Sequence, residues 1–283
     1  MNRKPNLPAY EKMGRAIACS RPLAEQIEDI DRYGGHGCVN TLRNATLAAH
    51  GIPKAGATAE NCLIFGCYRP FNTPFFLRDC VRLLELLDID YTYLEHEYCC
   101  GAPLLMSAAP EQYEAAAAAG KSFIGRNLEA ARQKGAQRVA YGCNACAHAA
   151  RAAFPQEAEQ NIYILDLILD HLADRLLKIR PATVGYFEGC HAFVRANYPG
   201  GEIDFARYRR LLDRIEGLTV IDLSNKMCCK SSAGAIIESA EKLNLGKLLV
   251  SCSGCYFPLS QAATGRVQVL SLPELLLQAL VKP

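Results

Sequence analysis

The chain has 283 residues, of which 50% are hydrophobic and 21% charged, and its formal net charge is +2 at pH 7. This balance is typical of a folded globular protein and excludes a disordered or fibrous one. It gives no electrostatic case for nucleic-acid binding. No apolar run approaches the roughly 20 residues that span a bilayer, and the polar N-terminus does not predict a secretory signal. We therefore expect a cytoplasmic protein with no nucleic-acid partner and no membrane span.

Residues 1–60 predict a short helical N-terminal arm. Two helices are expected over residues 23–33 and 39–50, and the glycine-rich segment 34–37 separates them. We expect this segment to be flexible and the arm to pack on the part of the chain that follows it.

Strands and helices alternate along the rest of the chain, in two halves at residues 61–180 and 181–283. The predicted strands are 64–65, 91–94, 139–141 and 162–165 in the first half, and 184–187, 218–223, 248–250 and 267–270 in the second. The predicted helices are 75–87, 111–133, 204–216 and 235–243. Ser271, with Glu274 three residues later, predicts the start of a capped helix. Asp166 is expected to cap the corresponding helix of the first half. This alternation predicts an α/β fold with parallel sheets.

Four blocks recur in the same order in both halves, which indicates an internal duplication. The blocks that begin at Cys62, Leu94, Arg138 and Tyr163 correspond to those that begin at Val184, Leu223, Leu248 and Gln268. Each block is a short apolar strand followed by a loop, and the first three loops of each half carry cysteine. Sites in parallel sheets gather beyond the carboxyl ends of the strands, where these cysteines lie.

Fourteen cysteines stand out in the composition, and ten of them fall in the repeated blocks in the order Cys, Cys-Cys, Cys-x-x-Cys. The first set is Cys67, Cys99, Cys100, Cys143 and Cys146, and the second set is Cys190, Cys228, Cys229, Cys252 and Cys255. In a cytoplasmic chain, clustered cysteines indicate a metal site rather than disulfide bonds. One zinc ion takes four ligands, whereas five thiols, two of them adjacent, suit an iron–sulfur cluster.

The run Cys67…Cys99-Cys100-Gly101…Cys143-x-x-Cys146 resembles the cysteine-rich CCG domain, which is duplicated in the B subunit of heterodisulfide reductase. The likeness covers about residues 62–283 and implies two Rossmann-like CCG domains, at 61–180 and 181–283. It implies that the five cysteines of each set hold a noncubane [4Fe-4S] cluster and that the two clusters face each other. It also implies cleavage or formation of a sulfur–sulfur bond, as in the heterodisulfide reductase-like complexes of sulfur oxidation.

The resemblance further implies two partners, a ferredoxin-like C-type subunit and a flavoprotein A-type subunit. The sequence itself carries no ferredoxin motif and no dinucleotide-binding fingerprint, so the electrons must come from a partner protein. A small disulfide or a lipoyl-bound sulfur is the expected substrate, entering between the repeats. Two alternatives stay open: a non-catalytic electron-transfer subunit of a larger redox complex, and a zinc-binding structural module.

The second copy departs from the family pattern. Lys230 stands where the first copy has Gly101, and the connection from Cys229 to Cys252 has 22 residues, against 42 in the first copy. Because glycine lets a backbone approach a cluster closely, a different geometry or a zinc ion at the second site stays open. Beside a cluster, the Lys230 ammonium would offset negative charge and raise the reduction potential. Lys230 is therefore a candidate active-site residue.

Two histidines, an arginine run and four further cysteines are also candidates. His191 follows Cys190 directly and His96 precedes Cys99 by three residues, so either is a candidate proton donor to a leaving thiolate, or simply a histidine hydrogen-bonded at the cluster rim. Four arginines on the helix expected at 204–216 form either a solvated face or a docking surface for an acidic partner: Arg207, Arg209, Arg210 and Arg214. Four cysteines outside the repeated order are expected to be small buried hydrophobes: Cys19, Cys38, Cys62 and Cys80.

Overall fold

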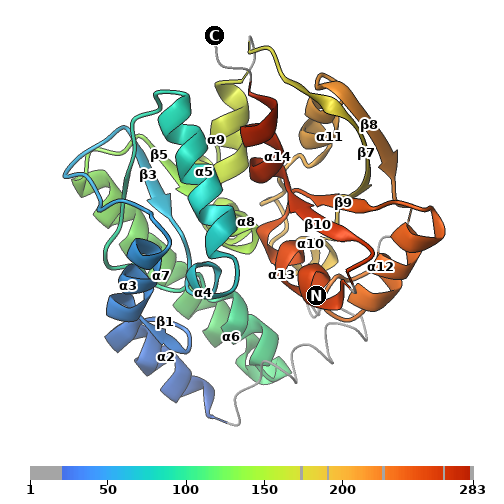
Figure 1. Cartoon of the computed structure of the whole chain (residues 1–283). Coiled ribbons are helices and arrows are strands. Elements are labelled where there is room, and N and C mark those ends of the chain that lie inside the picture. Colours follow the sequence, from blue (N-terminus) through green and yellow to red (C-terminus); the bar gives the residue numbers. More distant parts are fainter. Residues whose placement is uncertain (1–20, 173–174, 190, 225–226, 264, 281–283) are drawn as a thin grey trace.

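The computed structural model describes residues 21–280, apart from residues 173, 174, 190, 225, 226 and 264. Within this part of the chain, each cysteine repeat forms its own four-stranded parallel sheet flanked by helices (Figure 1). The α/β fold with parallel sheets that the sequence predicts is therefore confirmed.

The first sheet is built from β3 (Asn61–Ile64), β4 (Thr92–Tyr93), β5 (Arg138–Tyr141) and β6 (Asn161–Tyr163). The helices around it are α4 (Arg69–Asn72), α5 (Pro74–Leu86), α6 (Ala102–Ser107), α7 (Tyr113–Gln133), α8 (Asn144–Ala153) and α9 (Ile164–Asp170), with 3₁₀ turns at Pro110–Gln112 and Pro155–Glu157. All strand residues except Arg138 are buried, as in parallel sheets that helices cover on both faces.

The second sheet is built from β7 (Lys178–Phe187), β8 (Glu216–Asp222), β9 (Lys247–Val250) and β10 (Gln268–Ser271). Its helices are α10 (Ala192–Asn197), α11 (Ala206–Leu212), α12 (Ala233–Lys242), α13 (Ser253–Ala262) and α14 (Leu272–Ala279). The helix predicted at 204–216 is thus shorter than expected, because β8 begins at Glu216. Among the helices that the structure describes, none is both long and apolar enough to cross a membrane.

The two sheets share one topology. The first runs β4-β3-β5-β6 and the second β8-β7-β9-β10, so both follow the order second, first, third, fourth strand of their own copy. The first and third strands are central neighbours, and the chain leaves them toward opposite edges of the sheet. Such a switch point opens a crevice beyond the carboxyl ends of the strands. The loops that leave these ends carry the cysteines.

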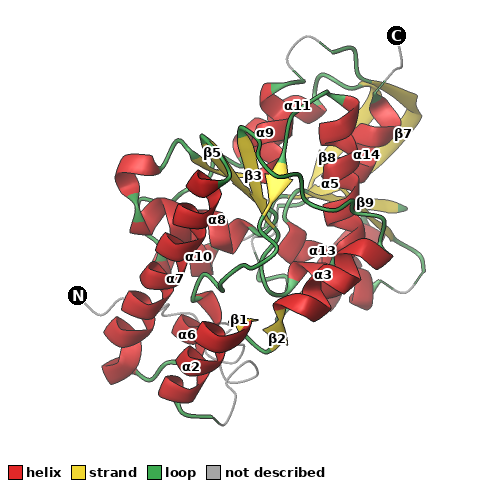
Figure 2. Cartoon of the chain, turned by 90° about the vertical axis from the view of Figure 1, so that its left-hand side faces the viewer, coloured by secondary structure: helices red, strands yellow, loops and turns green. Residues whose placement is uncertain are grey.

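The N-terminal arm contains α2 (Leu23–Tyr33), β1 (Gly34–Gly35), β2 (Cys38–Val39) and α3 (Asn40–Ala49). Helix α2 packs on α6 and α7 (Figure 2), and α3 packs on α4 and α5. The prediction that the arm packs on the first copy is confirmed for the described residues. The glycine-rich segment predicted to be flexible instead forms the antiparallel ribbon β1–β2, and the Gly34 carbonyl accepts the N–H of Cys99 at 2.7 Å.

The final helices of the two copies hold the copies together. Helix α14 packs on α5 of the first copy. Asp166, on α9, accepts hydrogen bonds from the Tyr208 hydroxyl at 2.8 Å and from Arg207 at 3.1 Å. Ser253 adds two buried contacts, because its hydroxyl donates to the Gly142 carbonyl at 2.9 Å and its N–H donates to the Tyr163 hydroxyl at 3.1 Å.

The two predicted helix caps differ in outcome. The Ser271 hydroxyl accepts the N–H of Glu274 at 3.3 Å, so this cap is confirmed. Asp166 was predicted to cap the corresponding helix, which is wrong. It lies inside α9, and its carboxylate is occupied by the second copy.

Candidate metal centre

A cavity lies between the two copies, and eight of the ten motif cysteines line it. It encloses about 930 Å³ of space, part of which is open to solvent. The lining cysteines are Cys67, Cys100, Cys143 and Cys146 of the first set, and Cys228, Cys229, Cys252 and Cys255 of the second. Cys190 lies outside the described residues, although its neighbour His191 lines the same cavity. Four described cysteines of each set therefore face one shared space.

The first set is assembled from three loops. Cys67 follows β3, the adjacent pair Cys99 and Cys100 follows β4, and Cys143 is the N-cap of α8. The Sγ atoms of Cys67 and Cys99 are 3.7 Å apart, and those of Cys146 and Cys100 are 3.3 Å apart. The thiols of loops that are distant in sequence are thus already in contact.

A glycine with a left-handed backbone precedes the first cysteine of each set. Gly66, just before Cys67, has φ +79°, and a Cβ there would lie 3.4 Å from the Cys146 Sγ. Gly189 is its counterpart in the second copy, with φ +104° and a Cβ position 3.4 Å from the Cys255 Sγ. Both copies thus place a left-handed glycine beside the second thiol of the Cys-x-x-Cys pair, so the internal repeat extends to the site.

The two Cys-x-x-Cys pairs also share their electrostatics. A hydrogen bond from Cys146 lowers the pKa of Cys143 to about 6, and the charge of Arg69 acts in the same direction. A hydrogen bond from Cys255 likewise lowers the pKa of Cys252. Both lowered thiols are N-caps, where the helix dipole favours a thiolate. The second cysteine of each pair has a raised pKa because of its hydrogen bonds to neighbouring thiols.

Gly101 has a packing role that the sequence did not predict. It has φ +80° at the start of α6, and a Cβ there would lie 2.5 Å from the Cα of Gly120 on α7. The glycine is therefore required by the packing of two helices and by its left-handed backbone. Lys230, in the corresponding position, does not have a positive φ, and the following helix α12 has 10 residues where α7 has 21. The second copy lacks the contact that demands glycine.

Two cations line the cavity together with the thiols. The Lys230 side chain is exposed at the cavity surface. The protein atoms around its ammonium partly exclude water and lower its pKa, and the charge of Arg69 lowers it further. Arg69 is 7% exposed and donates to the Ser253 carbonyl at 3.0 Å, which joins the first copy to the second. No carboxylate is among the described residues of the lining. Sequence reasoning missed Arg69, because the second copy has Ala192 at this position and the repeat gave no signal.

The two candidate histidines are in different surroundings. His191 is buried in the cavity wall, where its Nε2 lies 2.8 Å from the Glu188 carbonyl and its ring stacks on Phe205 at a centroid distance of 3.8 Å. His96 is exposed, contacts the ring of Tyr98 and does not line the cavity. Only His191 is near the thiols.

The structure also shows the burial of the remaining cysteines and the contacts of the four arginines. Cys62 and Cys80 are fully buried, as predicted. Cys38 is only half-buried, and its thiol donates to the carbonyl of Cys67 at 3.3 Å; Cys19 lies outside the described residues. The arginines of the run contact protein groups: Arg207 pairs with Asp166 and Asp170, Arg209 with Asp213 and Asp222, and Arg210 with Asp204, while Arg214 donates to the Leu172 carbonyl. These pairings leave little unbalanced positive charge for a docking surface.

Within the described residues, no group of three or more His, Cys, Asp and Glu side chains is close enough to hold a single metal ion. The thiols are instead distributed along the cavity wall.

The cysteine-rich domain family CCG matches residues 63–150 and, a second time, residues 184–260. These matches cover more than half of the chain, so the chain belongs to this family and contains the domain in two copies.

Three relatives are the D subunits of dihydromethanophenazine:CoB–CoM heterodisulfide reductase from three Methanosarcina species. Identity is 23% over 182 residues for the Methanosarcina mazei protein and 25% over 182 residues for that of Methanosarcina barkeri, each covering 60% of this chain and 42% of the relative. It is 26% over 166 residues for Methanosarcina acetivorans, covering 54% of this chain and 38% of the relative. The chain thus spans about two fifths of these relatives. A solved aspartate racemase homologue from Pyrococcus horikoshii covers 77% of this chain and 96% of its own, at 15% identity and a TM-score of 0.35.

Proposed function

We propose that this chain is the iron–sulfur subunit of an oxidoreductase that cleaves or forms a sulfur–sulfur bond between two facing noncubane [4Fe-4S] clusters. The observation that carries this proposal is the shared cavity, which eight motif thiols from both copies line. Soft thiolates are the ligands that iron–sulfur clusters use. Five cysteines in each repeated set exceed the four ligands of one zinc ion.

The proposed ligands are the five cysteines of each set. Cys67, Cys99, Cys100, Cys143 and Cys146 hold the first cluster, and Cys190, Cys228, Cys229, Cys252 and Cys255 hold the second. When bound, such clusters supply electrons one at a time and iron sites that accept a thiolate sulfur. Arg69 and Lys230 offset the negative charge that two thiolate-ligated centres bring into one cavity.

The cavity is the proposed entry for a small disulfide or a lipoyl-bound sulfur. Cleavage of one disulfide consumes two electrons and two protons and gives two thiols, and formation is the reverse. His191 is the proposed proton donor to a leaving sulfur, because its imidazole lines the cavity wall. Lys230, which shares the cavity with the thiols, is the proposed electrostatic partner of the second centre.

The proposed partners are a ferredoxin-like C-type subunit and a flavoprotein A-type subunit, with this chain in the place of the B-type subunit. Support comes from the relatives, each of which is named as one subunit of a reductase. The duplicated domain is the proposed shared part, since the chain spans about two fifths of those relatives.

The test uses the full chain purified without oxygen and an artificial one-electron donor. We expect donor-dependent release of two thiols per disulfide, and loss of this activity in both Cys100→Ser and Cys229→Ser. A chain that takes up and passes on electrons but never turns over a disulfide is instead the non-catalytic electron-transfer subunit.

A further inference from the structure

A buried ion pair lies beside the first cysteine set. Arg43 Nη1, on α3 of the N-terminal arm, is 2.6 Å from the Glu97 Oε1, and the two side chains are 2% and 4% exposed. Glu97 precedes Cys99 by two residues in the loop after β4. A charge pair this deeply buried costs desolvation and needs further hydrogen bonds to be tolerated.

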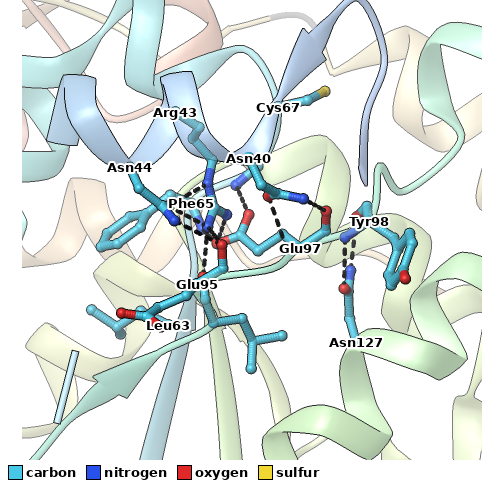
Figure 3. Close-up of polar contacts among 12 residues, drawn as sticks. Asn40, Arg43, Asn44, Leu63, Phe65, Cys67, Glu95, Glu97, Tyr98 and Asn127 are labelled. Atoms are coloured by element: carbon cyan, nitrogen blue, oxygen red, sulfur yellow. Dashed lines mark hydrogen bonds and ion pairs between the residues drawn. The ribbon is translucent and has the colours of Figure 1, made fainter. Parts of the chain in front are cut away.

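Those hydrogen bonds come from the other cysteine loop. The Glu97 carboxylate accepts the backbone N–H of Phe65 at 2.9 Å on one oxygen, and that of Gly66 at 2.8 Å on the other. These two amides directly precede Cys67. Figure 3 shows Glu97 between the arm and the end of β3, with Cys67 near by. One side chain thus ties the Cys67 loop to the Cys99-Cys100 loop.

The arm holds the rest of the Cys99 loop through its backbone. Asn40 donates to the Glu97 carbonyl at 3.1 Å and accepts the Glu97 N–H at 3.0 Å. Arg43 Nη2 donates to the carbonyls of Leu94 and Glu95, at 2.6 and 2.9 Å. The Cys99 N–H also donates a hydrogen bond to the Gly34 carbonyl. Residues of the arm thus hold the backbone that leads to the cysteine pair.

The second copy has no counterpart to this arrangement in its sequence. Lys226 stands at the position of Glu97, which reverses the charge, and the arm precedes only the first copy. The arm–loop pair of Arg43 and Glu97 is therefore not repeated residue for residue in the second copy.

We infer that Glu97 is a positioning residue, which with Arg43 fixes the separation of the Cys67 loop and the Cys99-Cys100 loop before any metal binds. The arm then acts as a clamp on the first thiol set. The metal part of this inference depends on the proposed function, but the arrangement of the loops does not.

The plainer alternative is that the pair only stabilises the fold. The two roles predict that a substitution changes amide exchange and thiol reactivity in different parts of the chain. A general loss of stability affects amides and thiols in both copies, whereas loss of a clamp affects Phe65, Gly66 and the first thiol set. Local measurements on the metal-free chain therefore separate them.

The test is hydrogen–deuterium exchange of the full metal-free chain with Glu97→Gln, read at the amides of Phe65 and Gly66. We expect exchange at one or both of these amides to rise at least about tenfold, because glutamine has one uncharged acceptor oxygen where Glu97 offers two charged ones. Alkylation of Cys67 and Cys99, followed by mass spectrometry, should accelerate in parallel, while Cys252 and β9 stay as in the wild type. Asp166→Asn is the matched control, because it removes a charge between the copies and touches neither loop.

Arg43→Lys provides a second variant if Glu97→Gln does not fold. It keeps the positive charge but cannot present the planar fork that reaches Leu94 and Glu95, so the Cys99 loop should exchange faster and the second copy should not. With iron bound, either variant should alter the electron paramagnetic resonance signal of the first centre alone. Wild-type exchange at Phe65 and Gly66 in Glu97→Gln, or equal changes in both copies, overturns the clamp. If the exchange results are as expected but the chain binds no iron, the proposed function is contradicted and the clamp is not.

Discussion

Gly101→Ala tests why the first copy carries glycine after its cysteine pair. A Cβ at this position lies 2.5 Å from the Gly120 Cα, which is backbone and cannot rotate away. The φ of +80° adds a conformational cost of about 1–2 kcal/mol for alanine. Forcing α6 away from α7 adds about 1–3 kcal/mol of overpacking. The unfolding free energy should therefore fall by roughly 2–5 kcal/mol.

Gly135→Ala is the matched control, since Gly135 has φ +78° but a Cβ there meets nothing within 4 Å. It should lose only the conformational part, about 1–2 kcal/mol. The assay is denaturant unfolding of the metal-free full chain, with the slope of the transition checked for each variant. Equal losses in the two variants would refute the helix-packing explanation and return Gly101 to a role at the metal centre.

Three further outcomes follow from the proposed centre. Cys100→Ser should remove or remodel the first centre and leave the second unchanged, as measured by iron content and spectrum. Cys80→Ser, at a buried cysteine outside the motif, should change neither centre. An unaltered spectrum of the first centre in Cys100→Ser would contradict the ligand assignment. Lys230→Gly should lower the potential of the second centre by tens of millivolts, and Lys230→Glu by more, because one charge at several ångströms contributes on the order of 1–4 kcal/mol before solvent screening; unchanged midpoints in a redox titration would show that Lys230 does not act on the centre. The purified chain alone should not oxidise NADH, and turnover with NADH in the absence of other proteins would contradict the need for a partner.

The parts of the fold and site that follow from the sequence are those set by local pattern. Apolar runs, their spacing and the repeated order of the cysteines located the strands, the parallel sheets and the loops that carry the thiols. The shared cavity also follows, because both copies present their cysteines at the carboxyl ends of strands. The repeat even extends to the paired glycines Gly66 and Gly189.

What the sequence could not reveal depends on contacts between distant segments. Asp166 follows a strand as a cap residue would, but Tyr208 of the other copy occupies its carboxylate. Arg69 and Glu97 have no equivalent in the second copy, so comparing the repeats does not single them out. The contact of Gly101 with Gly120 could not be predicted for the same reason, since it exists only after α7 folds back.

Whether both cysteine sets hold iron–sulfur clusters is decided by the metal content of the full chain purified without oxygen. Iron, acid-labile sulfide and zinc are determined on one sample, with electron paramagnetic resonance of its reduced and oxidised states. The proposed function predicts about eight iron atoms per chain, two [4Fe-4S] clusters, and no stoichiometric zinc. About four iron atoms with one zinc ion would confine the cluster to one copy, and zinc without iron would contradict the proposed function.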